Sequence, residues 1–500
     1  MGTQELYLLS PELLIGCFAL FIIILGTIFK FTKITYLIAI IGTVASLCTS
    51  IYLLLTSESQ IILYNSYSLD DFSLFLKTLI FASLLVVLIM SISKKNDIIS
   101  SHSEYISLLF FSALGLSLLV SSVELITIYI SIELATIPLS VLAAFHTNKN
   151  ASEAGLKFLI MGGISSAIML YGMVLLYGLT GSLTLDGISS TLASTNSVAY
   201  TESILWGLSL LLILAGIGFK IATVPFHMWA PDFYQAAPTP VTTFIATASK
   251  VAGFAILIRV LVNISSISTS SFAIELSQNL SLILAILAIA TMVVGNISAI
   301  AQKDIKRLLA YSSIAHAGYI LIPIVAIGYM NTTNTITDIL SAIVFYLVAS
   351  LLMTGIAFIC INIITQQKNG ADISSFNKLG YRNPLIAIAL TISLISLIGL
   401  PPTAGFIAKI YIFGVAIKYN LLWLAIIGVI NSVISAYYYL GIIKAMYFNE
   451  DNDTKAIIVP KEISLILIIM SAALVIILSL IHISEPTRRT PISYAVFCLK

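Results

Sequence analysis

The sequence predicts an all-α polytopic membrane protein with about fourteen transmembrane helices. Of its 500 residues, 59% are hydrophobic and 9% are charged, whereas a soluble domain carries about 25% charged residues. Apolar runs of about 20 residues, the length of a helix that crosses the hydrocarbon core, recur along almost the whole chain. No soluble fold could bury so much apolar surface, so lipid is the expected solvent.

Short polar connectors separate the predicted spans. The spans run approximately over residues 11–29, 35–55, 73–93, 104–121, 124–145, 155–179, 203–224, 240–263, 279–300, 309–328, 337–365, 385–416, 421–443 and 462–482. Positive charges collect in the odd-numbered connectors, which contain Lys30, Lys33, Lys94, Lys95, Lys149, Lys303, Lys306, Arg307, Lys368, Lys378, Arg382, Lys444, Lys455 and Lys461. The even connectors contain only Lys418. The positive-inside rule therefore predicts that the N-terminus lies outside.

Two spans are interrupted in the same way. The seventh carries Lys220 and then Pro225, and the twelfth carries Pro401 and Pro402 before Lys409. Prolines break a membrane helix, and the freed backbone groups need protein or water as partners. Five spans separate the two breaks, and an odd-numbered repeat inserts upside down relative to its copy. Paired broken helices in inverted halves are typical of transport sites.

Ionisable residues inside the spans are few, and such residues are usually functional. Glu133 lies half-way along the fifth span, before Pro138, while Lys220 and Lys250 flank the connector after the seventh. At an effective dielectric of about 20, a carboxylate about 10 Å from an ammonium interacts with it by roughly 1.7 kcal/mol. Movement of the partner of Glu133 could thus decide whether Lys220 holds or releases a proton.

Three further residues join this predicted proton path. His316 lies within the tenth span, and its imidazole titrates in the range that suits proton transfer. Lys409 follows the break in the twelfth span, and Lys157 begins the sixth span on the inner side. Lys157 also has a plainer interpretation, in which its side chain reaches the interface. The same interpretation is adopted for Lys77, and Arg259 is interpreted as an interfacial anchor.

The sequence contains no motif for redox chemistry. Its four cysteines lie singly, without CxxC or metal-ligand spacing, and no glycine-rich phosphate or dinucleotide loop is present. We therefore expect no cofactor and no metal in this chain, and no nucleic-acid partner.

Four segments resemble the subunit N family of proton-pumping NADH:quinone oxidoreductase, respiratory complex I. They read IELATIPLSVLAAF, FKIATVPFHMWAPDFYQAAPTPVTTFIATASKVAGFA, GNISAIAQKDIKRLLAYSSIAHAGY and LGYRNPLIAIALTISLISLIGLPPTAGFIAKIYIF. The resemblance implies a proton relay through Glu133, Lys157, Lys220, Lys250, His316 and Lys409. In it Glu133 tunes Lys220, Lys250 is the central relay, and Lys409 lies on the outward exit side. The related subunit M carries glutamate at the position of Lys409, and the L-type subunit has a long lateral helix, so both fit less well.

The resemblance also implies a division of the chain. An N-terminal three-helix segment (1–100) is followed by a first antiporter-like repeat of helices 4–8 (101–265), a second inverted repeat of helices 9–13 (266–445) and a last helix (446–478). Residues 479–500 include SEPTRRTP and resemble the translation of a sequencing adapter, so the last helix is expected to be truncated.

The predicted function is proton translocation in a respiratory-chain translocase of the bacterial inner membrane. NADH, FMN, Fe–S clusters and quinone would bind partner subunits, and the other membrane-arm subunits and lipid would surround this chain. Two alternatives are a subunit of a multisubunit Na⁺/H⁺ antiporter, and a structural membrane-arm subunit without its own proton path.

Overall fold

A computed structural model describes residues 3–28, 32–92, 101–146, 148–195, 199–266, 270–329, 334–368, 370–449 and 459–484. The first half of the chain contains α1 (Thr3–Leu8), α2 (Ser10–Ile28), α3 (Thr32–Thr56), β1 (Gln60–Ile62), β2 (Tyr67–Leu69), α4 (Asp71–Ile92), α5 (His102–Ser121), α6 (Leu125–Ala143), α7 (Lys149–Thr180), α8 (Leu185–Ser194), α9 (Tyr200–Ile221), α10 (Trp229–Ala236), α11 (Thr239–Phe244), the π-helix η1 (Ile245–Ser249) and α12 (Lys250–Ser266). The second half contains α13 (Ser271–Ile300), α14 (Ile305–Val325), η2 (Ala326–Tyr329), α15 (Asn334–Lys368), η3 (Ile373–Phe376), α16 (Leu379–Arg382), α17 (Pro384–Ile398), α18 (Ala404–Lys418), α19 (Leu422–Phe448) and α20 (Lys461–Ser484).

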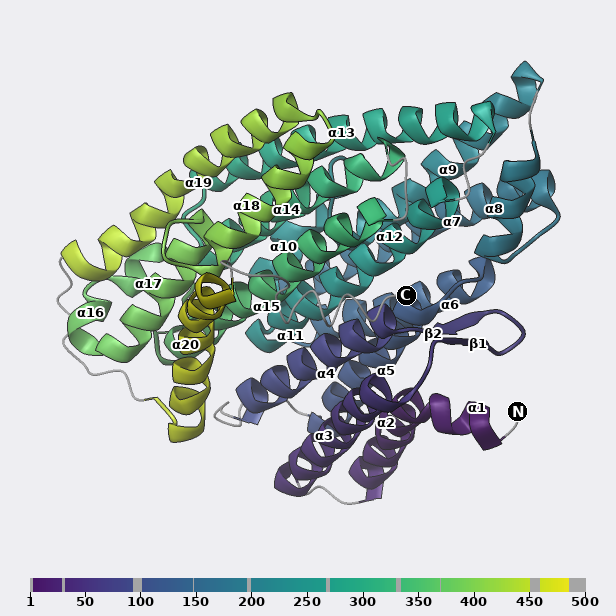
Figure 1. Ribbon diagram of the computed structural model, residues 1–500. Helices are drawn as coiled ribbons and strands as arrows, with labels where there is room; N and C mark the ends of the chain where they lie inside the picture. Colours follow the sequence, from purple (N-terminus) through teal and green to yellow (C-terminus); the bar gives the residue numbers. More distant parts are fainter. Residues whose placement is uncertain are drawn as a thin grey trace.

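The predicted all-α polytopic membrane fold is confirmed (Figure 1). Among the described residues, twelve helical segments are long and apolar enough to cross a membrane, and two shorter apolar segments lie at Pro384–Ile398 and Ile463–Val475. Each predicted span coincides with a helix, the eighth with the continuous run α11–η1–α12 and the twelfth with α17 and α18 together. The number of membrane crossings stays a prediction. The last sixteen residues, 485–500, which hold most of the proposed adapter sequence, lie outside the described part of the chain.

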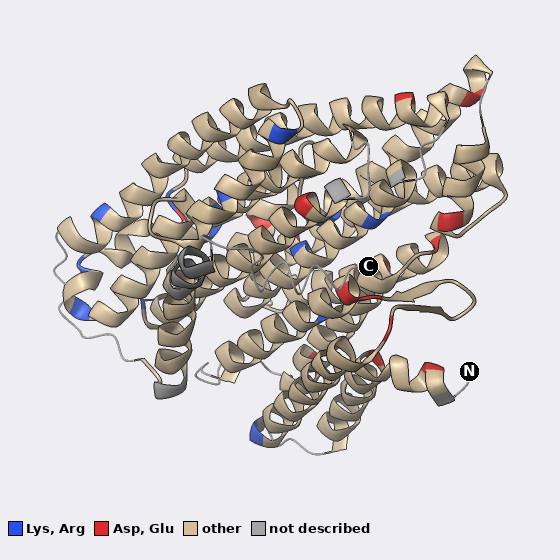
Figure 2. Ribbon diagram, in the orientation of Figure 1, with Lys and Arg blue, Asp and Glu red and all other residues tan. Residues whose placement is uncertain are grey.

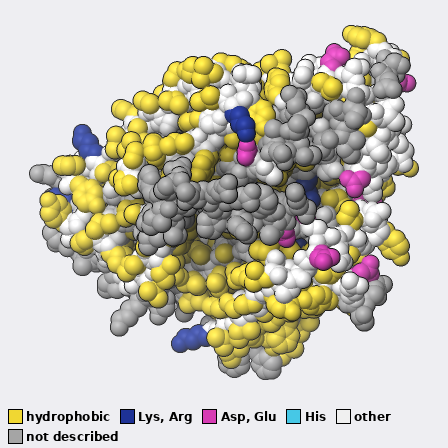
Figure 3. All heavy atoms as spheres, in the orientation of Figure 1, with side chains coloured by type: hydrophobic (Ala, Val, Ile, Leu, Met, Phe, Trp, Pro, Cys, Tyr) yellow, Lys and Arg dark blue, Asp and Glu magenta, His cyan; other side chains and the backbone are white. Residues whose placement is uncertain are grey.

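The centre of the molecule is formed by the helices that carry Lys250 and His316. In the segments Thr239–Ser265 and Ile305–Tyr329, 89% and 94% of the residues in an 18-residue stretch are buried. The corresponding values for α2 and α19 are 28% and 33%. The outer helices therefore present their apolar side chains to the surroundings, and hydrophobic side chains cover much of the described surface in Figure 3. Such a surface is suited to lipid.

A small hairpin closes one end of the N-terminal helices. Strands β1 and β2 pair antiparallel, with Gln60 opposite Leu69 and Ile62 opposite Tyr67. Tyr67 and Leu69 are buried against Leu8, Leu9 and other apolar residues of the first helices. The hairpin lies beside α1 and the start of α4 (Figure 1).

Two groups of three helices share the same local geometry, 180 residues apart in sequence. Helices α5 and α6 cross closely at Gly115, where an added Cβ would lie 2.4 Å from the backbone nitrogen of Ala135. Helices α13 and α14 cross in the same way at Gly295, where the distance to the backbone nitrogen of Ala315 would be 2.6 Å. Only glycine permits this approach of two backbones.

Backbone pairing repeats with the helix crossings. The residue before α6, Glu124, forms an isolated antiparallel bridge with Thr184, which precedes α8. The residue before α14, Asp304, forms the same bridge with Asp372, which precedes η3. In both groups the long helix between the bridge partners, α7 or α15, returns the chain across the fold.

The close helix crossing predicts the effect of a single methyl group. In an ordinary helix, Gly→Ala stabilises by up to about 1 kcal/mol, but Gly115→Ala forces α5 away from the α6 backbone. We expect a net loss of about 1–3 kcal/mol, as in other overpacked cores, visible as a lower Tm of the purified protein. Gly178→Ala is the matched control, because nothing lies within 4 Å of the added Cβ there. An equal Tm for both variants would contradict the crossing.

Candidate functional site

Lys220 lies where the seventh predicted span ends. Helix α9 stops at Ile221 because Ala222 adopts a left-handed conformation with φ 58°, and Thr223 then donates its backbone N–H to Gly218 O. The released carbonyl of Phe219 accepts a hydrogen bond from Trp229 Nε1 at 3.1 Å. The buried Lys220 ammonium donates to Thr136 Oγ1 on α6, at 3.2 Å. A neutral hydroxyl, rather than a carboxylate, therefore solvates this charge.

Glu133 lies one turn before Thr136 on α6 and is partly exposed. Its carboxylate acts electrostatically on Lys220, but no acidic oxygen of the described chain lies within 4 Å of the Lys220 ammonium. The two residues are thus coupled at a distance, with Thr136 as the direct partner. Pro138 lies inside α6 without ending it.

Lys250 is positioned by a π-helix. The segment η1 ends at Ser249, immediately before Lys250, and π-helical turns inside α-helices are frequent at functional sites. The buried ammonium donates to the backbone oxygen of Ser313 on α14. This contact joins the two most buried helical segments of the fold.

A small cavity separates Lys250 from His316. Its volume is about 20 Å³, enough for one water molecule by the usual criterion of about 10–15 Å³. Its lining is partly polar and consists of Ala246, Lys250, Leu309, Ser312, Ser313, His316, Ile320, Ser350, Thr354 and Leu397. The cavity gives a single water the polar partners it needs between the two basic side chains.

His316 is held by two tyrosine hydroxyls that the sequence interpretation missed. Its Nδ1 lies 2.6 Å from the Tyr346 hydroxyl on α15, and its Nε2 lies 3.3 Å from the Tyr439 hydroxyl on α19. Tyr439 also bonds to Ser312. A buried tyrosine hydroxyl generally needs a polar partner, so Tyr in the middle of an apolar span was the available signal. Its partner could not be read from the sequence.

Lys409 is solvated by the broken end of α17. Gly399 ends that helix with φ 82°, and the Lys409 ammonium donates to Leu397 O at 3.2 Å, Ile398 O at 2.7 Å and Ser432 Oγ at 2.8 Å. The last carbonyls of a helix form its negative end, which favours a cation. The ammonium also lies 4.9 Å from the centre of the Tyr319 ring.

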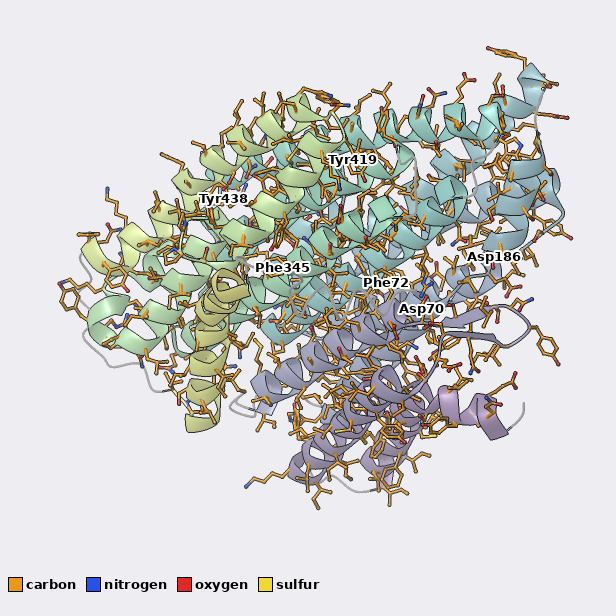
Figure 4. All side chains as sticks on the ribbon, in the orientation of Figure 1. Asp70, Phe72, Asp186, Phe345, Tyr419 and Tyr438 are labelled. Atoms are coloured by element: carbon orange, nitrogen blue, oxygen red, sulfur yellow. The ribbon has the colours of Figure 1, made fainter. Side chains whose placement is uncertain are left out.

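A polar network surrounds the Lys409 side of this site. Asn296 donates to the hydroxyl of Tyr319 at 3.3 Å and to Asn431 Oδ1 at 3.2 Å, and it accepts from Tyr438 at 3.0 Å. Figure 4 labels Tyr438 on α19. These side chains were also missed, because the contacts join residues up to 142 positions apart.

Lys157 lies apart from the other basic residues. Its half-exposed ammonium contacts Glu153 Oε1 and Asp232 Oδ2, each at 2.8 Å, and Arg307 binds the other oxygen of Asp232 at 2.8 Å. The pocket beside these groups has a volume of about 380 Å³ and is lined by Asn148, Asn150, Glu153, Ala154, Lys157, Asp232, Gln235 and Ala236. Its relay role stays a prediction, and the contacts match the interfacial interpretation.

Helix α10 links the two halves through Asp232, which the sequence interpretation did not select. The helix packs against both α7 and α14, and its aromatic face joins Phe158, Phe219, Trp229 and Phe233 with ring centroids 4.7–5.8 Å apart. Burial alone would raise the pKa of Asp232, but Lys157 and Arg307 together lower it below the ordinary value.

The structure thus brings Lys250 and His316 together around one cavity, and Lys409 adjoins it through Leu397. Leu397 is the shared element, because it lines the cavity while its carbonyl accepts from Lys409. Lys220 is buried with Thr136, Glu133 lies one turn away, and Lys157 lies at the surface. Figure 2 shows the positive residues within the helices of the second half.

Comparison with known proteins assigns this chain to a family. The family model described as NADH:quinone oxidoreductase/Mrp antiporter matches residues 122–435. NADH-quinone oxidoreductase subunit N of Dehalococcoides mccartyi is 37% identical over 475 residues, with 94% of this chain and 95% of that protein covered. Subunit N of Bacillus anthracis is 37% identical over 480 residues, with 94% and 92% covered. This chain belongs to the NADH-quinone oxidoreductase subunit N family.

The fold of this subunit N family member agrees with solved structures. A chain of respiratory complex I from Thermus thermophilus matches with a TM-score of 0.78 and 29% identity, covering 95% of this chain and 99% of that one. An archaeal membrane-bound sulfane sulfur reductase matches with a TM-score of 0.84 at 24% identity, covering 98% and 96%. At 24% identity, the match to the sulfane sulfur reductase shows a shared fold and nothing more.

The ion pairs of Asp232 predict a pH-dependent stability. Because its folded pKa is lowered, the contribution is present above the unfolded pKa of about 3.9 and is lost as pH falls through the folded pKa. Asp232→Asn should therefore lower the free energy of unfolding at pH 7, by about 1 kcal/mol or less for each partly exposed pair, and the Tm should fall with it. The difference should vanish in acid. Asp338→Asn, which removes the exposed pair with Lys418, is the control, and a pH-independent difference for Asp232→Asn would count against the assignment.

Proposed function

We propose that this chain is a proton-translocating membrane-arm subunit of NADH:quinone oxidoreductase. The observation that carries the proposal is that the buried Lys250 and His316 line one cavity with room for a single water, and that the buried Lys409 adjoins this cavity through Leu397. Family membership supports it, since relatives named subunit N cover almost the whole chain. In this proposal NADH, FMN, Fe–S clusters and quinone bind partner subunits, and this chain acts as part of a translocase.

The tyrosine hydroxyls beside His316 suit its imidazole to proton transfer. A neutral imidazole has one donor and one acceptor nitrogen, and a protonated one has two donors. Both ring nitrogens face a hydroxyl, of Tyr346 or Tyr439, and a hydroxyl can donate or accept. His316 can therefore gain, lose or move a proton without leaving a ring nitrogen unpaired.

Neutral hydrogen-bond partners also suit Lys220, Lys250 and Lys409 to proton transfer. The ammonium groups of Lys220, Lys250 and Lys409 contact hydroxyl and carbonyl oxygens, so no carboxylate holds the proton in place. A proton that leaves Lys250 can pass through one water in the cavity to His316, and onward to Lys409 beside Leu397. Glu133 biases Lys220 electrostatically from a distance, and the redox-driven conformational changes of partner subunits would alter that bias.

The domain division belongs to the same proposal. We infer two antiporter-like repeats at 101–265 and 266–445, supported by the matching glycine crossings and backbone bridges 180–188 residues apart. The three predicted spans before residue 101, which correspond to α2, α3 and α4 and are preceded by the short α1, form a separate N-terminal segment in this proposal. The last helix, assigned to the segment 446–478, corresponds to α20, which begins at Lys461.

Location and partners follow from family and charge distribution. The protein is a multi-span integral membrane protein. We propose that it resides in a bacterial inner membrane with its N-terminus outside, next to other antiporter-like subunits and lipid. The 37% identity to a subunit N relative over nearly its full length favours this assignment over a Na⁺/H⁺ antiporter subunit.

Removal of the central amine tests the relay. Lys250→Ala should leave an assembled complex in which uncoupled NADH oxidation persists but fewer protons are pumped per electron, measured in proteoliposomes. Lys418→Ala removes an exposed lysine outside the proposed row and should pump normally. An unchanged proton-to-electron ratio in Lys250→Ala would refute the relay, whereas loss of assembly for conservative substitutions throughout the row would favour a purely structural role.

The hydroxyl of Tyr346 provides a finer test. Tyr346→Phe leaves Nδ1 of His316 without its partner, and an unsatisfied buried group costs about 1–3 kcal/mol, or roughly 5- to 150-fold in a proton-transfer equilibrium. Proton pumping should slow while uncoupled electron transfer is retained. Tyr437→Phe is the matched control, because Tyr437 is exposed on α19. Equal pumping rates for the two variants would exclude a role for the Tyr346 hydroxyl.

A further inference from the structure

A second group of buried charges lies outside the lysine row, at the hairpin end of the molecule. We call it the hairpin cluster, and it consists of Glu12, Tyr67, Asp70, Lys77 and Arg259. The expected interfacial position of Lys77 was wrong, since its side chain is fully buried beside Glu12. The expectation for Arg259 was also wrong, because its side chain is 9% exposed and pairs with Asp70.

The inner part of the cluster joins three segments. The Lys77 ammonium on α4 lies 2.9 Å from Glu12 Oε1 on α2, and it donates to the Tyr67 hydroxyl on β2 at 2.5 Å. It also lies 4.7 Å from the centre of the Tyr67 ring. Burial, and then the Glu12 carboxylate, raise the pKa of Tyr67 well above its ordinary value. The phenol therefore stays protonated, and its oxygen accepts a hydrogen bond from Lys77.

Glu12 is the unusual member of this group. Its residue is 3% exposed, yet neither carboxylate oxygen receives a hydrogen bond of acceptable geometry from the described residues. A buried acceptor without a hydrogen bond is costly, and a buried carboxylate can remove its charge by taking up a proton. The ammonium that could supply this proton lies 2.9 Å away.

The outer part of the cluster leads towards solvent. Arg259 binds Asp70 Oδ1 at 2.8 Å and donates to Val120 O at 2.6 Å, and Ser73 donates its backbone N–H to Asp70 at 2.7 Å. Burial alone would raise the pKa of Asp70, but Arg259 and Ser73 lower it. The Asp70 side chain is 25% exposed. Figure 4 labels Asp70 and Phe72 at the start of α4, and the Arg259 guanidinium lies 5.6 Å from the Phe72 ring centre.

The outer part of the hairpin cluster acts electrostatically on the inner part, and it shares helix α12 with Lys250. Asp70 and Arg259 both exert electrostatic effects on Lys77. Arg259 and Lys250 lie on the same helix, α12, nine residues and therefore about 13 Å apart along its axis. A displacement of α12 would change the Arg259–Asp70 contact, and with it the balance of charges around Lys77.

We propose that Glu12, Lys77 and Tyr67 form a second proton-exchange site, separate from the lysine row. In the exchange, an N–H bond of the Lys77 ammonium breaks and an O–H bond forms on Glu12, which leaves an amine beside a carboxylic acid. The net charge of the pair is zero before and after the transfer. Tyr67 hydrogen-bonds to the lysine, and the Asp70–Arg259 pair, which reaches the surface, connects the site with water at the hairpin end.

A fixed ion pair is the competing explanation, and the two explanations differ spectroscopically. The assembled complex with Glu12→Gln should lose a carbonyl-stretching band of a protonated carboxylic acid from its infrared spectrum, recorded as the difference from the unsubstituted complex. The apolar double variant Glu12→Leu/Lys77→Leu should assemble but pump fewer protons per electron. A buried ion pair with only a structural role can be replaced by apolar residues without loss. An unchanged spectrum for Glu12→Gln, or an unchanged proton-to-electron ratio in the double variant, would overturn the proposal.

Two further variants keep the result decisive. If Glu12→Gln does not assemble, Tyr67→Phe retains the ion pair and the ring, and it should shift the carboxylic-acid band through loss of the hydroxyl. An unshifted band would overturn the site. Asp338→Asn should keep the band, because Asp338 lies in an exposed ion pair outside the cluster. Lys250→Ala should keep it too, since a spectrum of the resting complex requires no turnover, so failure of the relay and failure of this site are distinguishable.

Discussion

The arrangement of this protein depends on the cost of burying an ammonium group without a carboxylate partner. Placing an isolated charge in an apolar interior is expensive unless polar groups surround it. Three buried lysines meet this requirement with neutral oxygens: Lys220 with Thr136, Lys250 with Ser313 O, and Lys409 with the carbonyls at the end of α17. Each of these lysines lies within about three turns of an interrupted helix. Lys220 precedes the break at Ala222, Lys250 directly follows η1, and Lys409 follows the break at Gly399. The irregular backbone solvates the charge directly at Lys409, whereas at Lys220 and Lys250 the contacted oxygen belongs to a neighbouring regular helix.

Two classes of buried cation follow from this constraint. The ammonium groups of the row contact neutral oxygens, which lose little when the lysine becomes an amine. In the hairpin cluster, Lys77 and Arg259 contact the carboxylates of Glu12 and Asp70, which lose a counter-charge if only one partner changes protonation. In the proposed exchange, transfer within the pair avoids that imbalance, so proton movement in the cluster would be concerted, whereas in the row it could proceed one group at a time.

The helices and the candidate residues could be predicted from the sequence, but the hydrogen-bond partners of those residues could not. The spans, the breaks after Lys220 and before Lys409, and the isolation of Lys250 could be predicted because apolar length, proline position and intramembrane charge are local properties. Tyr346 and Tyr439 could not be linked to His316, since each contact spans 30 or 123 residues. Lys77 was misjudged for the same reason. Its partner Glu12 lies on another helix near the N-terminus, and a lysine near a helix end ordinarily reaches water. The π-helix before Lys250 has no sequence signal that this reasoning used.

The 180-residue correspondence gives unequal roles to two equivalent positions. Gly115 and Gly295 match, as do Ala135 and Ala315, and the next position on that scale pairs Thr136 on α6 with His316 on α14. Thr136 contacts Lys220, while His316 faces the cavity beside Lys250. A threonine hydroxyl offers a single oxygen, whereas an imidazole offers two ring nitrogens, one of which can accept a proton while the other gives one up. In the proposed relay, the two architecturally matching halves would therefore differ: a proton could enter and leave the second half through different atoms of one side chain, which Thr136 does not allow in the first. Such an asymmetry would give a near-symmetric scaffold a direction.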